Sequence, residues 1–266
     1  MNFDGIIKER PRISDDVCDE HCISKVEFGG HVFCPECAAE LTKQHEQDVI
    51  DLETEKYYDR NKRFMNRSLY TDKSLKNATF DNFHTTDNET TVNKQKARLL
   101  AGHYLKGSIK NTIITGNVGT GKSHLAMSML KAVNEFSDPN MKCLFVSMDE
   151  LLAKLRFSYN HNDVESEDDL RRLCVDADLL VIDDLGAEVG SIDTDKQASN
   201  DNIRLLKGIL NGRMDKPTIF TTNLNREQMD DLYDDRIVSR VMKGISNLDN
   251  IISFKETTDK RSKIDF

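Results

Sequence analysis

The sequence predicts an α/β protein in which a five-stranded parallel sheet lies between helices, preceded by a small cysteine-containing module and a helical linker. Three observations lead to this fold class. Strand-like and helical segments alternate after residue 110, which is typical of a parallel sheet covered on both faces. A glycine-rich loop at 116–123 joins the first of these strands to a helix. Cysteine and histidine residues stand in short-spaced pairs near the N-terminus.

Composition excludes several classes of protein. Of the 266 residues, 38% are hydrophobic and 31% are charged, which is not the composition of a disordered chain. No apolar run approaches the roughly 20 residues of a membrane span, and residues 1–11 lack the apolar core of a signal peptide. We therefore expect a cytoplasmic protein with no membrane partner. Because the net charge is -9, any nucleic-acid contact must come from a local basic surface.

Two ligand pairs near the N-terminus have the spacing of a tetrahedral zinc site. Cys34 and Cys37 form the second pair. The first pair is ambiguous, because Cys18 and His21 have the usual spacing whereas Cys22 offers another thiolate one residue further on. We favour Cys18, His21, Cys34 and Cys37 as the ligands of Zn²⁺, with Cys22 as the rival of His21. Four protein ligands leave no open position, so the metal is expected to be structural.

The segment 23–33 between the two pairs suits a hairpin, because Val26 and Phe28 precede Gly29-Gly30 at the turn and Val32 and Phe33 follow it. The module is acidic, which favours a protein partner over a nucleic acid. Residues 36–67 lack Gly and Pro and predict a long exposed helix with a thin apolar stripe, either a solvated spacer or a docking surface. In the loop-like segment 68–91, Phe80 and Phe83 either wall an adenine pocket or seal the domain edge. A helix is expected over 92–106.

The stretch 116–123 fits the pattern G-x-x-x-x-G-K-[ST] of a phosphate-binding loop. Its glycines let backbone amides turn inward, and the following helix presents free N–H groups to an anion. Lys122 supplies a charge at the β- and γ-phosphates, and Ser123 offers a hydroxyl to Mg²⁺. The candidate ATP-binding residues are Gly116, Asn117, Val118, Gly119, Thr120, Gly121, Lys122, Ser123 and His124.

Five strands are expected in the sheet, at 112–115, 143–147, 179–183, 218–221 and 251–254. Ligands of such sheets bind at the carboxyl ends of the strands. The third strand ends in Asp183, a candidate Mg²⁺ ligand together with Ser123, and Asp184, a candidate for polarising the attacking water. The fourth strand leads to Asn223, which either orients that water or forms an ordinary turn.

Basic residues later in the chain have two interpretations each. Arg236 and Arg240 share one helix face and either pair with nearby aspartates or reach the γ-phosphate bound by a neighbouring subunit. Four further side chains are candidates for contacts with single-strand phosphates, although a solvated face is the commoner explanation. These four are Lys154, Arg156, Arg171 and Arg172.

The segments GNVGTGKSHLA, LLVIDDLGAE, PTIFTTNL and DRIVSRV, with the zinc module, together resemble the DnaC/DnaI-type replicative helicase loaders of bacteria and their phages, which are AAA+ ATPases. The resemblance covers about residues 110–255, and the zinc module resembles a subgroup that is often phage-encoded. It implies that 116–123 bind phosphate, that Asp183 and Asp184 form the Walker B pair and that Asn223 is sensor 1. It also implies that Arg240 is an arginine finger and Arg236 its helper.

The resemblance implies a zinc-binding helicase-interaction module over 1–45, a helical linker over 46–78 and an AAA+ ATPase domain over 79–266. The expected function is ATP-dependent loading of the hexameric replicative DNA helicase onto single-stranded DNA, in a bacterial cell or a phage-infected host. The expected cofactors are ATP, Mg²⁺ and Zn²⁺, and the active state is expected to be a homo-oligomer of up to six subunits. The alternatives are an IstB-type transposase helper ATPase, an adaptor that binds ATP without hydrolysing it, and a zinc-dependent DNA-binding regulator.

Overall fold

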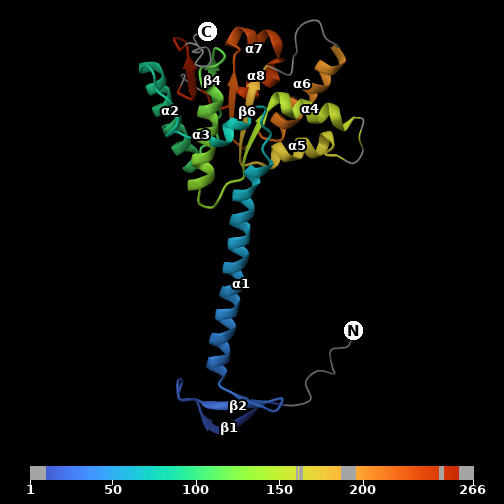
Figure 1. Ribbon diagram of the computed structural model, residues 1–266. Helices are drawn as coiled ribbons and strands as arrows, with labels where there is room; N and C mark the ends of the chain where they lie inside the picture. The colour runs from blue at the N-terminus through green and yellow to red at the C-terminus, as the bar shows by residue number, and fades with distance from the viewer. Residues whose placement is uncertain (1–9, 160, 162–163, 187–195, 246–248, 258–266) are drawn as a thin grey trace. The chain divides into compact units, whose positions relative to one another are not determined.

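The computed structural model describes residues 10–159, 161, 164–186, 196–245 and 249–257. The chain divides into two compact units, Met1–Tyr57 and Tyr58–Phe266 (Figure 1). The division lies within the long helix α1 (Pro35–Arg63), so the segment 46–78 contributes to both units. Each unit is described by itself below.

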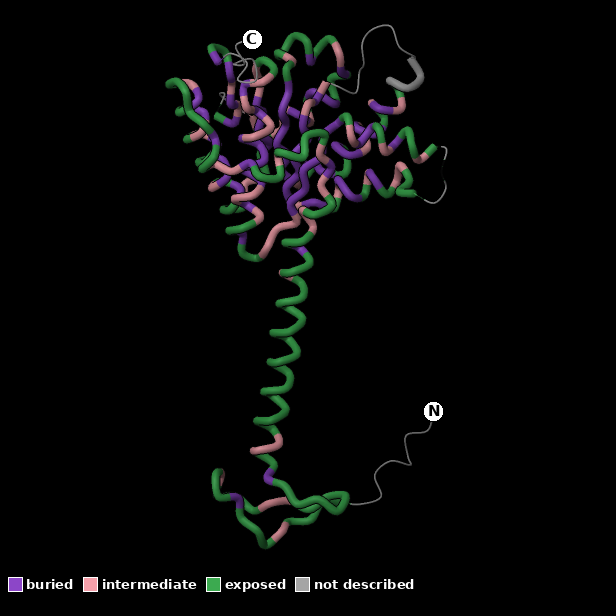
Figure 2. The backbone as a smooth tube through the Cα atoms, viewed as in Figure 1, coloured by how far each residue is buried: buried purple, intermediate pink, exposed green. Residues whose placement is uncertain are grey.

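The first unit contains a three-stranded antiparallel sheet in the order β1-β2-β3. The expected hairpin consists of β2 (Ser24–Phe28) and β3 (His31–Phe33), and the glycines at its turn have φ values of 58° and 77°. Strand β1 (Arg12–Val17) was not expected from the sequence. Helix α1 begins at Pro35, a residue suited to the first turn because that turn needs no N–H donor there. Most of α1 is exposed (Figure 2).

The second unit is built on the five-stranded parallel sheet that the sequence predicts. The strand order is β5-β6-β7-β4-β8, so β7 separates the strand before the phosphate loop from the strand that carries the two aspartates. This order brings the ends of β4, β6 and β7 side by side. The strands are β4 (Thr112–Gly116), β5 (Cys143–Ser147), β6 (Leu179–Leu185), β7 (Thr218–Thr222) and β8 (Ile251–Phe254).

Helices cover both faces of this sheet (Figure 1). Successive strand residues alternate between the faces, so Ile114 packs with α2 and α3 whereas Ile113 packs with α4, α5, α6 and α8. The helices are α2 (Asn88–Leu105), α3 (Lys122–Phe136), α4 (Met148–Ser158), α5 (Glu167–Asp176), α6 (Lys196–Asn211), α7 (Arg226–Leu232) and α8 (Asp235–Val241). Within the described ranges, no helix has the length and apolarity needed to cross a membrane.

A segment ahead of α2 closes the β5 edge of the sheet. The amide of Leu69 donates to the Phe145 carbonyl at 2.8 Å, and the amide of Ser147 donates to the Leu69 carbonyl at 2.9 Å. The hydroxyls of Thr71 and Ser147 lie 2.6 Å apart. Two short 3-10 helices flank this contact, η1 (Phe64–Arg67) and η2 (Lys73–Asn77). Residues 64–77 are therefore packed into the second unit rather than forming a separate linker.

Candidate nucleotide site and candidate metal centre

The phosphate loop joins β4 to α3 and is tightly enclosed by its neighbours. Gly116 has φ 142°, and a Cβ on it would meet the Phe254 carbonyl oxygen at 2.5 Å. Gly121 has φ 98°, and a Cβ there would meet the Phe83 ring at 2.8 Å. Both positions therefore require glycine for the backbone conformation and for the close approach. The loop is held between β8 on one side and Phe83 on the other.

Lys122 is the first residue of α3 and its side chain is only 5% exposed. Its Nζ donates to the Asn117 carbonyl oxygen at 2.7 Å and to Asn223 Oδ1 at 2.6 Å. The Thr120 hydroxyl also donates to the Asn117 carbonyl oxygen, at 2.9 Å. The structure thus brings together the lysine and the asparagine that the sequence nominated from two distant segments. An incoming phosphate would compete with Asn223 for this ammonium group.

Asp183 and Asp184 lie near the carboxyl end of β6 and are joined through Thr221 of β7. The Thr221 hydroxyl donates to Asp183 Oδ1 at 2.6 Å and accepts from the Asp184 amide at 2.9 Å. Burial, and next the charge of Asp184, raise the pKa of Asp183 to about 6. Asp184 has φ 59°, an uncommon backbone conformation that turns its side chain toward the cavity described next.

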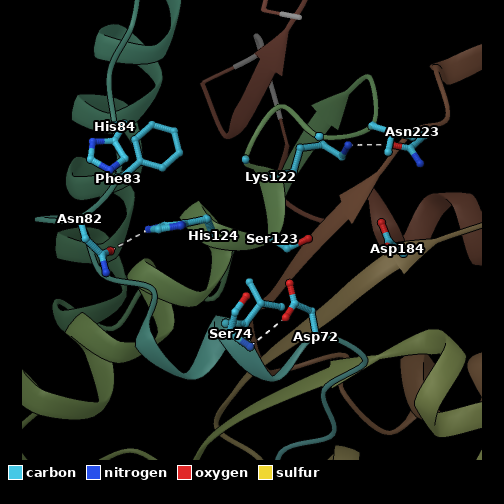
Figure 3. A pocket seen from close by; sticks show the side chains of 14 residues that line it. Asp72, Ser74, Asn82, Phe83, His84, Lys122, Ser123, His124, Asp184 and Asn223 are labelled. Carbon is cyan, nitrogen blue, oxygen red and sulfur yellow. Dashed lines mark hydrogen bonds between the residues drawn. The ribbon is translucent and has the colours of Figure 1, made fainter. Parts of the chain in front are cut away.

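A cavity of about 480 Å³ lies in front of the phosphate loop (Figure 3). Its lining includes Lys122, Ser123, Asp184 and Asn223. Asp183 is buried behind this lining and forms a hydrogen bond with Ser123. His124 also lines the cavity, and its Nε2 lies 3.0 Å from Asn82 Oδ1 and 3.0 Å from the Thr79 carbonyl oxygen. The remaining lining residues are Asp72, Ser74, Leu75, Asn82, Phe83, His84, Val118, Gly119 and Gly121.

The segment ahead of the core supplies a wall of the cavity that sequence reasoning largely missed. Asp72 and Ser74 come from the start of η2, where Asp72 accepts from the Ser74 amide at 2.8 Å. Phe83 is buried and meets the His124 ring edge-on at 5.3 Å. It therefore both lines the cavity and seals the edge of the unit, so the two interpretations of this residue are compatible. Phe80 instead packs beneath the Arg98 guanidinium, 5.4 Å from its ring centre.

The two candidate arginines are placed apart from this cavity. Arg236 is exposed and Arg240 is half-buried, both on α8, and neither lines the cavity at the phosphate loop. Arg240 donates from its Nη1 to the Arg236 carbonyl oxygen at 3.5 Å. They share one helix face, as expected from their spacing. Their assignment to the site of a neighbouring subunit remains a prediction.

Four side chains of the first unit converge on one point. The ligand atoms of Cys18, His21, Cys34 and Cys37 all lie within 4.8 Å of one another. Cys18 Sγ lies 3.6 Å from Cys37 Sγ, and His21 Nδ1 lies 3.3 to 3.7 Å from the three sulfurs. Cys22 is exposed, outside this group, with φ 55°. The structure therefore favours His21 over Cys22 as the fourth ligand.

The four residues fit a tetrahedral Zn²⁺ ion. Ligand bonds of about 2.3 Å for sulfur and about 2.0–2.1 Å for nitrogen place neighbouring ligand atoms about 3.5–3.8 Å apart. Most of the distances above lie in or close to this interval. His21 Nε2 lies 3.2 Å from Glu40 Oε1, so a carboxylate of α1 fixes the ring with Nδ1 facing the sulfurs. Three thiolates and an imidazole are the donor set that zinc prefers.

The sequence of this chain is similar to those of ATP-binding proteins. A family model described as "IstB-like ATP binding protein" matches residues 37–254. The replicative helicase loader DnaC of Escherichia coli strain K12 is 28% identical over 176 residues, which are 64% of this chain and 65% of that protein. The ATP-binding protein of insertion sequence IS21 from Pseudomonas aeruginosa is 28% identical over 150 residues, covering 56% of this chain and 51% of that protein. The match thus spans less than two thirds of either relative.

Solved structures with the same fold include further replication proteins. The DnaC helicase loader superimposes with a TM-score of 0.53 and 21% identity over 69% of this chain and 100% of that chain. DnaI gives 0.53 with 20% identity over 74% of this chain and 100% of that chain. Domain III of the Thermotoga maritima replication initiation protein DnaA gives 0.53 with 20% identity, covering 70% and 69% of the two chains. These similarities show a shared fold.

Proposed function

Because the chain belongs to the family of IstB-like ATP binding proteins, we propose that it is an ATPase that loads a replicative DNA helicase onto single-stranded DNA during replication. The observation that carries the ATPase proposal is the convergence of Lys122, Asp184 and Asn223 on one cavity at the phosphate loop. The similarity to proteins described as replicative helicase loaders supports the choice of partner.

The cavity residues divide the work of hydrolysis among them. Lys122 exchanges Asn223 for the β- and γ-phosphate oxygens of ATP. Asp184 accepts a hydrogen bond from the attacking water and polarises it. Asp183, held by Thr221, and Ser123 are the residues that would hold Mg²⁺. When bound, that ion neutralises charge on the phosphates. Freed from Lys122, Asn223 orients the water or the γ-phosphate.

Two further parts of the proposal concern assembly. Arg240, with Arg236, reaches the γ-phosphate of ATP bound to a neighbouring subunit, so the active form is a homo-oligomer of up to six subunits. Cys18, His21, Cys34 and Cys37 hold a structural Zn²⁺, and the module over 1–45 grips the hexameric helicase. Exposed apolar side chains on its strands, such as Ile13 at 82% and Val32 at 47%, suit a protein partner. Hydrolysis then times the release of the helicase in the bacterial or phage-infected cytoplasm.

The test is a pull-down of the host's replicative helicase by the full chain, paired with steady-state ATP hydrolysis. Asp184→Asn is expected to bind ATP and retain the helicase but to lose at least 100-fold in hydrolysis, on the order of the loss of a positioned general base. Arg240→Ala is expected to show the same loss, which mixing with Asp184→Asn subunits partly restores. Absence of helicase capture by the unsubstituted chain contradicts the loader proposal.

A second candidate, the helper ATPase of a transposase, is favoured by the IS21 relative and by the family description. It keeps the same cavity chemistry but replaces the helicase by a transposase and its DNA. Capture of a transposase rather than the helicase would select it. An adaptor that binds ATP without hydrolysing it is distinguished by Asp184→Asn, because helicase loading would then survive the substitution.

A further inference from the structure

A second cavity, of about 650 Å³, lies on the second unit and shares no lining residue with the cavity at the phosphate loop. The last turn of α1, the segment through η1 and η2, and the middle of α3 form its walls. Its chemistry is dominated by cations, which are Lys62, Arg63, Lys76 and Lys131. In a chain of net charge -9, such a local basic surface needs an explanation.

Only half of these cations have a carboxylate partner. Lys62 pairs with Glu135 at 3.2 Å, and Arg63 pairs with Asp59. Within the described part of the chain, neither Lys76 nor Lys131 forms an ion pair with a carboxylate; Lys131 Nζ donates to the backbone carbonyl of Lys76. Burial lowers the pKa of Lys131. Lys76 and Lys131 are thus the two cations of this cavity to which the described chain supplies no carboxylate, although Asp59, the partner of Arg63, also lines the cavity.

An aromatic side chain forms the wall beside these lysines. Tyr70 stacks on Phe145 of β5 with ring centres 5.5 Å apart, and Lys76 Nζ lies 5.5 Å from the centre of the Tyr70 ring. A ligand that places anionic oxygens beside Lys76 and Lys131 would supply the counter-charge that the described chain does not. The phosphates of a nucleic acid carry such oxygens.

Three of the four other basic residues considered for nucleic-acid contact form ion pairs within the fold, whereas the fourth, Arg156, is exposed on α4. Lys154 pairs with Glu165 at 2.9 Å, whereas Arg171 and Arg172 share Asp168 at 2.5 and 2.6 Å. A phosphate arriving there must displace these carboxylates. At the second cavity, in contrast, Lys76 and Lys131 need not give up an ion pair to bind a phosphate. The second cavity therefore brings two such cations to one place, whereas Arg156 is a single such cation among the four other candidates in the described part of the chain.

We propose that the second cavity binds the phosphate backbone of single-stranded nucleic acid, with Lys76 and Lys131 neutralising successive phosphates. This inference rests on the proposed function for one point, which is that the nucleic acid is single-stranded DNA. The strand would pass over the α3 side of the ATPase unit, away from the residues that bind ATP. Lys62 and Arg63, at the rim, would add weaker and more strongly screened attraction.

The test is fluorescence anisotropy with a labelled 20-nucleotide oligo-dT and the full chain, over a range of salt concentrations. Losing two phosphate contacts lowers the slope of log affinity against log salt by about 1.4 and weakens binding at 0.1 M salt roughly tenfold or more. Lys76→Ala with Lys131→Met is expected to show both changes. Lys154→Ala with Arg172→Ala, which also removes two positive charges, is the matched control and is expected to change the slope far less.

Two controls keep the result separate from the proposed function. The Lys76/Lys131 variant must bind ADP and capture the helicase as the unsubstituted chain does, which shows that it folds and that only strand binding is affected. An unchanged slope in this variant, or an equal loss in the matched control, overturns the proposal. Displacement of the oligonucleotide by millimolar ADP from a Lys122→Ala protein also overturns it, because the cavity would then be a site for free nucleotide.

Discussion

The Lys122 ammonium group lies 2.6 Å from Asn223 Oδ1, although the two residues stand 101 positions apart in the chain. This hydrogen bond joins the start of α3 to the loop between β7 and α7, the two places where a nucleotide would be sensed. Because the phosphates of a nucleotide need the same ammonium group, the bond opposes nucleotide binding. A phosphate that replaced Asn223 at Lys122 would also release the loop that carries Asn223.

Substituting Asn223 should therefore separate binding from hydrolysis. Asn223→Ala removes the competitor for Lys122, and since a hydrogen bond to a charged group contributes about 1.5 kcal/mol, ADP should bind about tenfold more tightly. Hydrolysis of ATP should fall at the same time. Isothermal titration calorimetry with ADP measures the first effect, and Asn223→Asp, which holds Lys122 more firmly and repels phosphate, should bind ADP more weakly. Equal ADP affinity in all three proteins would show that the bond does not oppose binding.

Two glycines should respond in opposite directions to alanine. Gly116→Ala places a Cβ against the Phe254 carbonyl at a position with φ 142°, so we expect a loss of about 2 kcal/mol or more in the free energy of unfolding. Gly102 lies inside α2 with no atom within 4 Å of an added Cβ, so Gly102→Ala should stabilise by about 0.5–1 kcal/mol. Urea unfolding of both variants checks the pair. A destabilised Gly102→Ala protein would show that helix propensity does not decide this site.

Glu89 should make stability depend on pH. Its carboxylate accepts from the amides of Lys255, Glu256 and Thr257 and from the Thr257 hydroxyl. Burial acts to raise its pKa, but these hydrogen bonds together hold the pKa below the usual value. The carboxylate therefore stabilises the fold above the usual glutamate pKa, and this contribution is lost as the pH falls through the folded-state value.

Glu89→Gln should accordingly lower Tm at pH 7, and its difference in Tm from the unsubstituted chain should begin to shrink only as the pH falls below the ordinary glutamate pKa of 4.5. Differential scanning fluorimetry at several pH values measures the difference. Glu135→Gln is a suitable control, because that carboxylate lies in an exposed pair with Lys62. A difference in Tm that is constant across this pH range would assign the effect to shape rather than charge.

Cys34 and Cys22 should respond differently to substitution, because Cys34 belongs to the ligand group and Cys22 lies outside it. Cys34→Ser should lose the metal and unfold the first unit, because a small antiparallel sheet cannot be stable without it. Cys22→Ser should keep one equivalent of zinc and the same circular dichroism, since Cys22 lies outside the ligand group. Elemental analysis of the purified proteins gives the zinc content. Loss of metal from Cys22→Ser but not from His21→Ala would show that Cys22, rather than His21, is the fourth ligand.

The fold of the second unit was predictable because its signals are local. Runs such as Leu179–Leu185 are apolar and β-branched over several residues, and the glycine-rich loop fixes the junction of β4 with α3. Strand β1 gave no such signal. Its two large apolar residues, Ile13 and Val17, are exposed, and the strand is held mainly by backbone pairing to β2.

Within the candidate site, the residues that could not be predicted are those contributed by a distant segment of the chain. The phosphate loop, Asp184 and Asn223 lie at strand ends that a pattern can locate, and all of them line or form the cavity. Asp72 and Ser74 reach it only because the preceding segment pairs with β5 and then crosses toward α3. The choice between His21 and Cys22 likewise depended on a backbone turn, at φ 55°, that spacing alone does not specify.

The pairing of Leu69 with β5 also protects the protein against association with itself. An exposed outer strand presents unpaired N–H and C=O groups to any other copy of the chain, which is a common route to aggregation. The Phe145 carbonyl and the Ser147 amide of β5 are instead both used by Leu69. A fragment that began at residue 79 would lose this cover along with part of the cavity wall. An isolated ATPase unit should therefore begin near Tyr58 if it is not to aggregate through the β5 edge at high concentration.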